Sequence, residues 1–342
     1  MRTLLTTLTL AISIAHASAP PIEPDPCENA AVLYGRAFLA ITFAGMEDDL
    51  AAFAYDDPTA EVPEWLAAAV GGEQHAVDTL SRATSLERCD WMLDHTRGLD
   101  LRLTHLGHVR TAARVLAIDA RLHAADGKPA KATDRLLAII AMSRHTRTDR
   151  TGISSLVSAA LIGLAEDTFN AAAPMLDEAS VRRVALGVQD RLDDSDVIGA
   201  RAAIRGEQSL ALDWIRSAMV EGATGTDIAD RIQREFYGNS DRFSVVLGKR
   251  LDRLRAMDAD SLRRAVEHAD RYYEAILRDW DSDDALDRLR DLNNEASEGS
   301  VGTLVALLGL ATSKLRIAET EVLELLARMQ ALLSDADAGT QK

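Results

Sequence analysis

Apolar residues recur every three or four positions along most of the chain, which is the spacing of one face of an α-helix. The alternation of apolar and polar residues that marks a half-buried strand is nowhere convincing. The sequence therefore predicts an all-α protein. The main predicted helices are 28–45, 73–87, 99–125, 130–145, 152–171, 179–192, 196–221, 225–237, 241–256, 258–279, 283–297, 301–312 and 314–333.

The best-defined pair of helices is 99–125 and 130–145. Gly127 interrupts the helical pattern between them, and Pro129 suits the first turn of the second helix. Small residues flank this turn and would let the two helices approach closely, as in tetratricopeptide hairpins. They are Ala124, Ala125 and Ala132. Because the unit does not recur at a fixed period, two architectures stay open: a tetratricopeptide-like array of antiparallel hairpins, or a helical bundle.

The composition of the helices changes near residue 192. Before it they are rich in Ala and Leu, and after it they are rich in Asp and Arg, as in RDWDSDDALDRLRDL. Mixed charges at helical spacing usually form a solvated face. We therefore expect a helical-hairpin region over 18–192, a charged helical region over 193–333 and a disordered tail over 334–342. One continuous array is the alternative to two subdomains.

The first 17 residues have the layout of a secretory signal peptide. Arg2 precedes an apolar run over 4–15, and overlapping small-x-small cleavage sites follow it. Pro20 would hinder a cut after Ala19, so the expected cut lies after Ala17. The apolar run is too short to span a bilayer, which takes roughly 20 residues. We expect an exported protein, periplasmic or extracellular, without stable membrane insertion.

Export determines what is expected of the two cysteines, Cys27 and Cys89. In an oxidising compartment, one pair without C-x-x-C spacing predicts a single structural disulfide. The alternative is a reactive thiol at Cys89 with His95 as its base. We prefer the disulfide, because an even pair of cysteines in an exported chain most commonly forms one.

The net charge of the chain disfavours some classes of binding partner. The chain has 38 Lys and Arg against 54 Asp and Glu, which gives a net charge of −16. Such an acidic protein is a poor ligand for nucleic acid or an anionic membrane. Only 4% of the residues are aromatic. This disfavours a sugar-cleaving enzyme, because such clefts stack their substrate on aromatic rings.

Histidines are the main candidates for chemistry, because six of the eight lie between residues 75 and 145. His105 and His108 are the one pair on a shared helix face that could hold a metal, with an acid from another helix as a further ligand. No H-E-x-x-H spacing supports this. The simpler interpretation is a helix packed with ordinary, partly buried histidines. We therefore expect neither a metal nor a cofactor.

Two further groups of residues have simple structural explanations. The acidic run 279–284 begins like a calcium loop, but it lacks the required glycine and has Arg290 where a bidentate Glu belongs. Helix capping explains it better. Glu207 lies between Arg205 and Trp214 on one predicted helix, where a buried ion pair is the default. Signatures of serine hydrolases, P-loops and dinucleotide-binding folds are missing.

Several short stretches share a layout: the signal peptide, the early helix ENAAVLYGRAF (28–38), the CDW triplet (89–91) and a hairpin like LDARLHAADG, here IDAR at 118–121. In these features the chain resembles a recurrent group of uncharacterised exported bacterial proteins made of helices. The resemblance covers residues 28–215 and implies an all-helical fold and export. It implies no activity, since none is established for the group.

Taken together, these patterns favour a non-enzymatic exported scaffold or interaction module that binds another protein or itself. The helical hairpins and the missing catalytic signatures lead to this expectation. Two alternatives stay open. One is a metal-dependent hydrolase using His105 and His108 with an acid from another helix, and the other is a carrier of a small ligand in an apolar cavity.

Overall fold

The computed structural model describes residues 28–41, 50, 61–192, 195–234, 245–282, 284–297, 302–308 and 312–339. The regular elements in these ranges are all helices, so the protein is all-α, as predicted. The predicted signal peptide over 1–17 and Cys27 lie outside the described residues. The α-helices are α1 (Ala30–Ala40), α3 (Glu64–Gly72), α4 (Gln74–Thr84), α5 (His105–Ala125), α6 (Pro129–Thr146), α7 (Gly152–Ala172), α8 (Glu178–Leu192), α9 (Ala200–Val220), α10 (Gly225–Ile232), α11 (Val245–Arg255), α12 (Ala259–Asp279), α13 (Ala285–Ser297), α14 (Thr303–Leu308) and α15 (Thr312–Gly339), with the 3-10 turns η2 (His95–Asp100), η3 (Arg147–Asp149) and η4 (Ala173–Met175).

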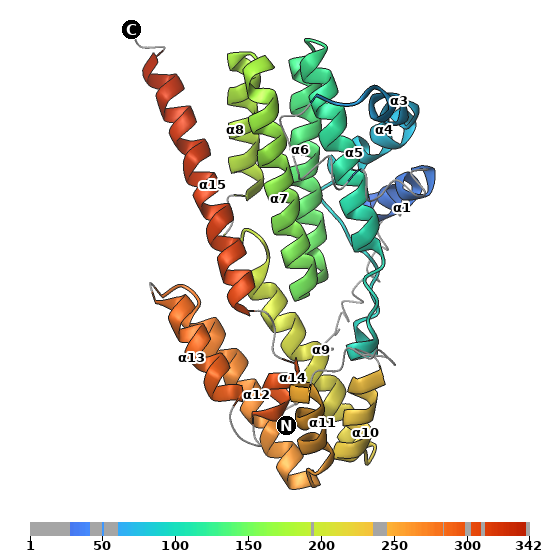
Figure 1. The fold of residues 1–342 in the computed structure, drawn as a ribbon, viewed down its shortest axis with the longest axis vertical. Helices are drawn as coiled ribbons and strands as arrows, with labels where there is room; N and C mark the ends of the chain where they lie inside the picture. Colours follow the sequence, from blue (N-terminus) through green and yellow to red (C-terminus); the bar gives the residue numbers. More distant parts are fainter. Residues whose placement is uncertain are drawn as a thin grey trace, which may run out of the picture.

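The helices form two groups (Figure 1). We call α5 to α8 together with α15 the bundle, because these long helices lie side by side. We call α9 to α14 the lower group, in which α9 leads away from the bundle and the shorter helices gather around it. The small helices α1, α3 and α4 cover α5 and α6 on the side of the bundle away from α15. One continuous set of buried apolar side chains runs from α1 to α15.

The helices α5 and α6 run antiparallel and are joined by three residues. Gly127 makes this turn with φ of +69°, a left-handed conformation that glycine adopts without strain. The backbone N–H groups of Gly127 and Lys128 donate to the carbonyls of Ala124 and His123, and they close the end of α5. Pro129 then begins α6. A tetratricopeptide-like array beyond this pair stays a prediction.

The first helix of this pair is shorter than predicted. The pattern predicted a helix over 99–125, whereas α5 begins at His105 and is preceded by the turn η2. Inside η2, Gly98 has φ of +57° and packs against Trp214 of α9, where an added Cβ would lie 2.7 Å from the indole side chain. Leu101, directly after η2, is extended with φ of −65° and ψ of 118°, so the chain is not helical between η2 and α5. Periodicity alone cannot show it.

The last helix, α15, returns to the bundle and packs against α7 and α8. Leu325 and Met329 are buried there, and Arg328 donates to Glu166 of α7 at 2.6 Å. The helix continues to Gly339, past the predicted end at 333, and the Ser334 hydroxyl donates to the carbonyl of Gln330 in these extra turns. Part of the expected disordered tail is therefore helical. The division at residue 192 stays a prediction, and it does not separate α15 from the bundle.

A buried carboxylate links the lower group to the bundle. Glu319 of α15 is 2% exposed and accepts hydrogen bonds from Trp280 Nε1 at 2.6 Å and from Arg316 Nη1 at 2.7 Å. Arg201 of α9 lies 3.8 Å from its other oxygen. A buried carboxylate is costly unless it is paired and hydrogen-bonded. These partners therefore determine how α9, α15 and the end of α12 meet.

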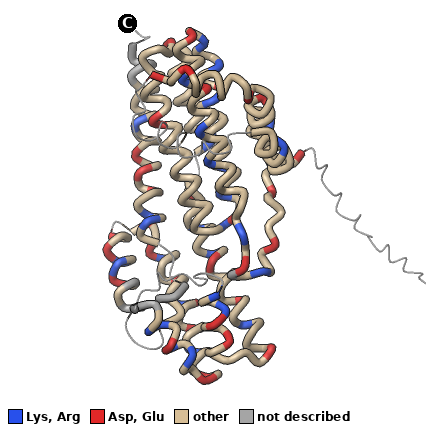
Figure 2. Tube along the Cα trace, turned by 45° about the vertical axis from the view of Figure 1, so that its right-hand side comes forward, with Lys and Arg blue, Asp and Glu red and all other residues tan. Residues whose placement is uncertain are grey.

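Charged residues are sparse along the central helices and frequent on α15 and the lower group (Figure 2). One described helix, α7 continued by η4 (Gly152–Met175), is long and apolar enough to cross a membrane by length and composition. In this fold 56% of its most apolar window is buried, and it packs against α5, α6, α9 and α15.

Candidate functional site

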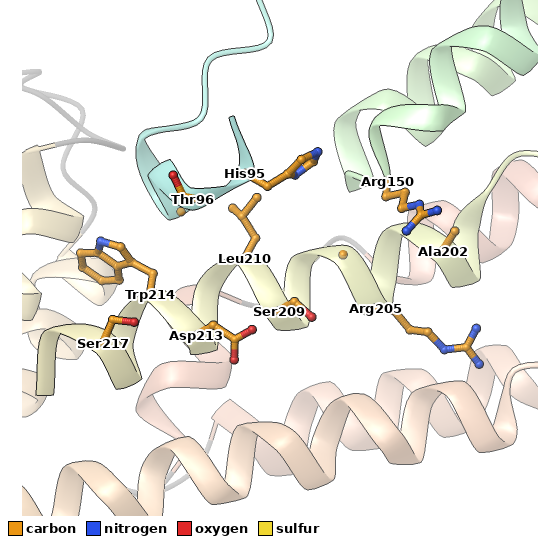
Figure 3. A pocket seen from close by; sticks show the side chains of 12 residues that line it. His95, Thr96, Arg150, Ala202, Arg205, Ser209, Leu210, Asp213, Trp214 and Ser217 are labelled. Carbon is orange, nitrogen blue, oxygen red and sulfur yellow. The ribbon is translucent and has the colours of Figure 1, made fainter. Parts of the chain in front are cut away.

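An open cleft of about 840 Å³ runs along one side of α9 (Figure 3). The turn η2 and the turn before α7 face α9 across it. The side chains used below come from these three elements: His95 and Thr96 from η2, Arg150 from the turn, and Arg205, Ser209, Leu210, Asp213 and Trp214 from α9.

Contacts at both ends hold η2 in place. At its start, the Asp94 carboxylate accepts hydrogen bonds from the Thr96 backbone N–H at 3.1 Å and from the Thr96 hydroxyl at 2.5 Å. These bonds lower the pKa of Asp94, so the cap stays ionised. At its end, Asp100 forms an ion pair of 2.9 Å with Arg231 of α10. The imidazole of His95 is thereby placed in the cleft, pointing toward the Arg150 end (Figure 3).

The turn before α7, which forms part of the cleft beside η2, is strained and packs tightly against α9. Arg150 has φ of +56°, in the left-handed region that residues other than glycine rarely adopt. Its carbonyl lies so close to Gly206 that a Cβ there would be 2.0 Å from the oxygen. The next turn is fixed by Gly152, whose backbone N–H donates to Glu207 Oε1 at 2.9 Å. Burial raises the pKa of Glu207, and this hydrogen bond partly offsets the shift.

Arg150 and Arg205 make one end of the cleft basic. Both side chains line the cleft at the same end (Figure 3), and neither has an ion-pair partner among the described residues. The acid of the cleft, Asp213, is paired with Arg216 at 2.9 Å. Guanidinium groups that line one end of a cleft and have no carboxylate partner among the described residues suit an anionic group, which they bind through charge-assisted hydrogen bonds.

A histidine–carboxylate pair lies next to the cleft. His105 Nε2 is 2.8 Å from Asp149 Oδ2, and the ring of Trp91 stacks on the imidazole with centroids 4.4 Å apart. Burial raises the pKa of Asp149, and the hydrogen bond from His105 and the nearby imidazole of His95 partly offset this. The other carboxylate oxygen of Asp149 has no hydrogen-bond partner in the described part of the chain. This is the one contact in which an acid from another element meets a predicted site histidine.

The two histidines predicted as candidate metal ligands do not converge. His105 contacts Asp149, whereas the ring of His108 stacks on Phe38 of α1 with centroids 5.6 Å apart. Within the ranges that the structure describes, no group of three or more His, Cys, Asp or Glu side chains could hold a metal ion. The two imidazoles belong to two separate contacts.

A buried aromatic cluster attaches the irregular segment 85–94 to α1 and α6. His145 Nδ1 is 2.9 Å from the hydroxyl of Tyr34, and Trp91 Nε1 donates to the backbone carbonyl of His145 at 2.8 Å. Tyr34 also stacks on Trp91, with centroids 5.4 Å apart. Burial lowers the pKa of His145 to about 4, so its imidazole is neutral near neutral pH. The cluster positions the segment that leads into η2.

Cys89 is buried beside this cluster, next to the start of α1. Asn29 Nδ2 donates to the Asp90 carbonyl at 2.8 Å, and the Asp90 N–H donates to Asn29 Oδ1 at 2.9 Å. Asn29, two residues after Cys27 in the sequence, is thus hydrogen-bonded to the residue after Cys89. Cys89 is the only cysteine among the described residues, so the pairing stays a prediction. Burial and the charges of Asp149 and Asp90 raise the pKa of the Cys89 thiol, which makes it a poor nucleophile while reduced.

The sequence analysis named two residues of this cleft, but the buried ion pair that it predicted for Glu207 is not observed. Arg205 and Trp214 were singled out with Glu207, and both line the cleft. Glu207, however, hydrogen-bonds to Gly152 rather than to Arg205. Arg150 was missed, because a left-handed arginine has no signature in a single sequence.

Comparison with protein-family models, with curated proteins and with solved structures found no match to this chain. The resemblance to exported all-helical bacterial proteins therefore stays a prediction.

Proposed function

We propose that this protein is an exported helical scaffold that binds a segment of another protein in the cleft along α9. The observation that carries this proposal is the open cleft with two guanidinium groups at one end that have no ion-pair partner within the described part of the chain. Arg150 and Arg205 would bind an acidic group of the partner, either an Asp or Glu side chain or a C-terminal carboxylate.

The dimensions and lining of the cleft fit a short peptide segment. Its α9 wall extends from Ala202 to Ser217, which is about 22 Å at 1.5 Å per helical residue. An extended chain of about seven residues has this length. Leu210 in the middle of the cleft and Trp214 toward the end away from Arg150 offer apolar surface (Figure 3). Tryptophan and arginine are the residue types that contribute most to binding energy at protein interfaces.

The cleft is largely organised before any partner binds. Gly98 packs against Trp214, and the guanidinium of Arg231 lies 4.7 Å from the centroid of the indole ring. The Arg150 turn is fixed on Gly206. A preformed site loses less conformational entropy when it binds. The carrier alternative would need an enclosed cavity, and this cleft is open to solvent.

Selection from a library of random displayed heptapeptides on the purified protein tests this proposal. We expect the selected peptides to contain an acidic residue, and we expect R150Q/R205Q to weaken their binding about tenfold or more. The matched control is R36Q/R110Q, which removes two exposed arginines from α1 and α5. Selected peptides without acids, or equal weakening in both double variants, would contradict the proposal.

A further inference from the structure

A second hollow lies between α7 and α15, on the bundle, and has a volume of about 540 Å³. Its floor, the apolar part of the lining, comes from both helices and includes large side chains such as Leu156 and Leu325 beside short ones. Ala159 and Gly163 come from α7, and Ala318 and Val322 come from α15. We call this hollow the α7–α15 groove.

The rim of the α7–α15 groove is acidic. Asp167, Glu321 and Glu324 line it and have no cationic partner among the residues described. Glu166 also lines it and is bonded to Arg328, the one basic side chain of the lining. Burial and the neighbouring charge of Glu166 raise the pKa of Asp167. The groove therefore has an excess of negative charge that a cationic ligand would relieve.

Gly163 leaves space in the floor that the protein itself does not use. A Cβ added at Gly163 would have nothing within 4 Å, although this glycine lies in the middle of α7. By contrast, a Cβ at Gly206 or Gly98 would meet a backbone or side-chain atom of this chain. Gly163 also lines the groove, so its open side is space within the groove that the side chains of this chain leave unoccupied.

The length of the groove defines the ligand further. On α7 it runs from Leu156 to Asp167, and on α15 from Ala318 to Arg328. Each stretch is about 16 Å long at 1.5 Å per residue, which is three helical turns. A groove with an apolar floor between two helices is the usual receptor for one face of an amphipathic helix.

We propose that the α7–α15 groove binds a basic amphipathic α-helix of a partner protein, about three turns long. The apolar face of that helix would pack on Ala159, Gly163 and Val322, and its Lys and Arg side chains would pair with the rim carboxylates. A second copy of this chain is a poor occupant, because its net charge of −16 repels the groove. The proposal is independent of the cleft along α9, which has the opposite charge.

The probe is a synthetic peptide of Leu and Lys at helical spacing. Its binding to the purified protein is measured by fluorescence anisotropy. We expect it to bind about tenfold more tightly than a peptide of the same composition in scrambled order, because only the ordered peptide forms an amphipathic helix. Binding should weaken as salt is added. No binding, or equal binding of the two peptides, would overturn the proposal.

Two matched pairs of variants locate the peptide. A Cβ at Gly163 meets no atom, and the leucine of G163L should occupy the floor and reduce binding about tenfold or more. G107L, at an exposed glycine of α5 whose added Cβ also meets no atom, should leave binding unchanged. E321Q/E324Q should weaken binding about tenfold at low salt, while E87Q/E274Q, which removes two exposed carboxylates elsewhere, should not. Thermal unfolding of G163L at or above the wild-type temperature would show that the loss is not due to misfolding. Wild-type affinity in G163L, or an equal loss in both Glu double variants, would overturn the proposal.

Discussion

The cleft along α9 and the α7–α15 groove are both open hollows beside a long helix, but they are built in opposite ways. The cleft is basic and depends on irregular backbone, with left-handed residues at Gly98 and Arg150. The groove is acidic and lies between two regular helices. The first is assembled by contacts between distant parts of the chain, and the second by the faces of helices.

This difference predicts where the molecule is vulnerable. The cleft depends on the segment 85–94, which is attached through Asn29, Tyr34 and His145. The groove depends only on the packing of α15 against α7 and α8. A perturbation of segment 85–94 should therefore damage the cleft and leave the groove intact. The four predictions below test this separation.

The largest expected effect comes from the predicted disulfide between Cys27 and Cys89. A bridge over about 60 residues stabilises a fold by about 4 kcal/mol in the chain-entropy model. We expect C27S to lower the free energy of unfolding by about this amount and to expose segment 85–94 to hydrogen exchange more than α7 or α15. Thiol titration of the denatured, unreduced wild type should find no free thiol. Two free thiols in protein produced by export to an oxidising compartment would contradict the pairing.

The second effect is a loss of stability in acid through His145. Its pKa is lowered by burial to about 4 in the folded state, whereas an unfolded histidine titrates near its ordinary pKa of about 6.5. The unfolded chain therefore takes up a proton first as the pH falls. The contribution of neutral His145 to the free energy of unfolding is fully present above pH 6.5. It is lost progressively toward pH 4, by about 3 kcal/mol. The raised pKa of Asp149 acts in the opposite sense and offsets part of this loss.

Urea unfolding of the wild type and H145Q at about pH 7 and about pH 4 measures this effect. Glutamine keeps an acceptor for Tyr34 but does not titrate, so H145Q should lose less stability over this range. H75Q is the control, because His75 is exposed on α4. If the wild type and H145Q lost the same free energy, His145 would not be the source.

The sequence predicts helices well where their ends are local. The predicted helix 258–279 is observed as α12, and Asp258 caps it by accepting the Ser261 N–H at 2.8 Å. The turn η2 was missed because it depends on distant partners, such as Arg231 for Asp100. The same holds for the candidate sites. Helical periodicity places residues on a face, but it cannot show which distant segment lies opposite.

The third prediction concerns Gly206, where the Arg150 turn meets α9. An alanine Cβ would lie 2.0 Å from the Arg150 carbonyl, so the backbone must shift. We expect G206A to lower the free energy of unfolding by about 2 kcal/mol, as overpacking does in other cores. It should also weaken the binding of the peptides that were selected on the cleft. Binding of the Leu and Lys peptide to the groove should be unchanged. Loss of both binding activities would mean that the two sites are not separately built.

The smallest expected effect is a gain of stability, and it comes from replacing Gly163 with alanine. An alanine Cβ there meets no atom within 4 Å, and alanine favours a helix over glycine by about 0.5–1 kcal/mol. G163A should therefore raise the free energy of unfolding by about this amount, as G107A should on the exposed side of α5. Urea unfolding of G206A, G163A and G107A compares one glycine that the fold requires with two that it does not. A destabilised G163A would mean that the floor of the groove is already filled, and no room would remain for a partner helix.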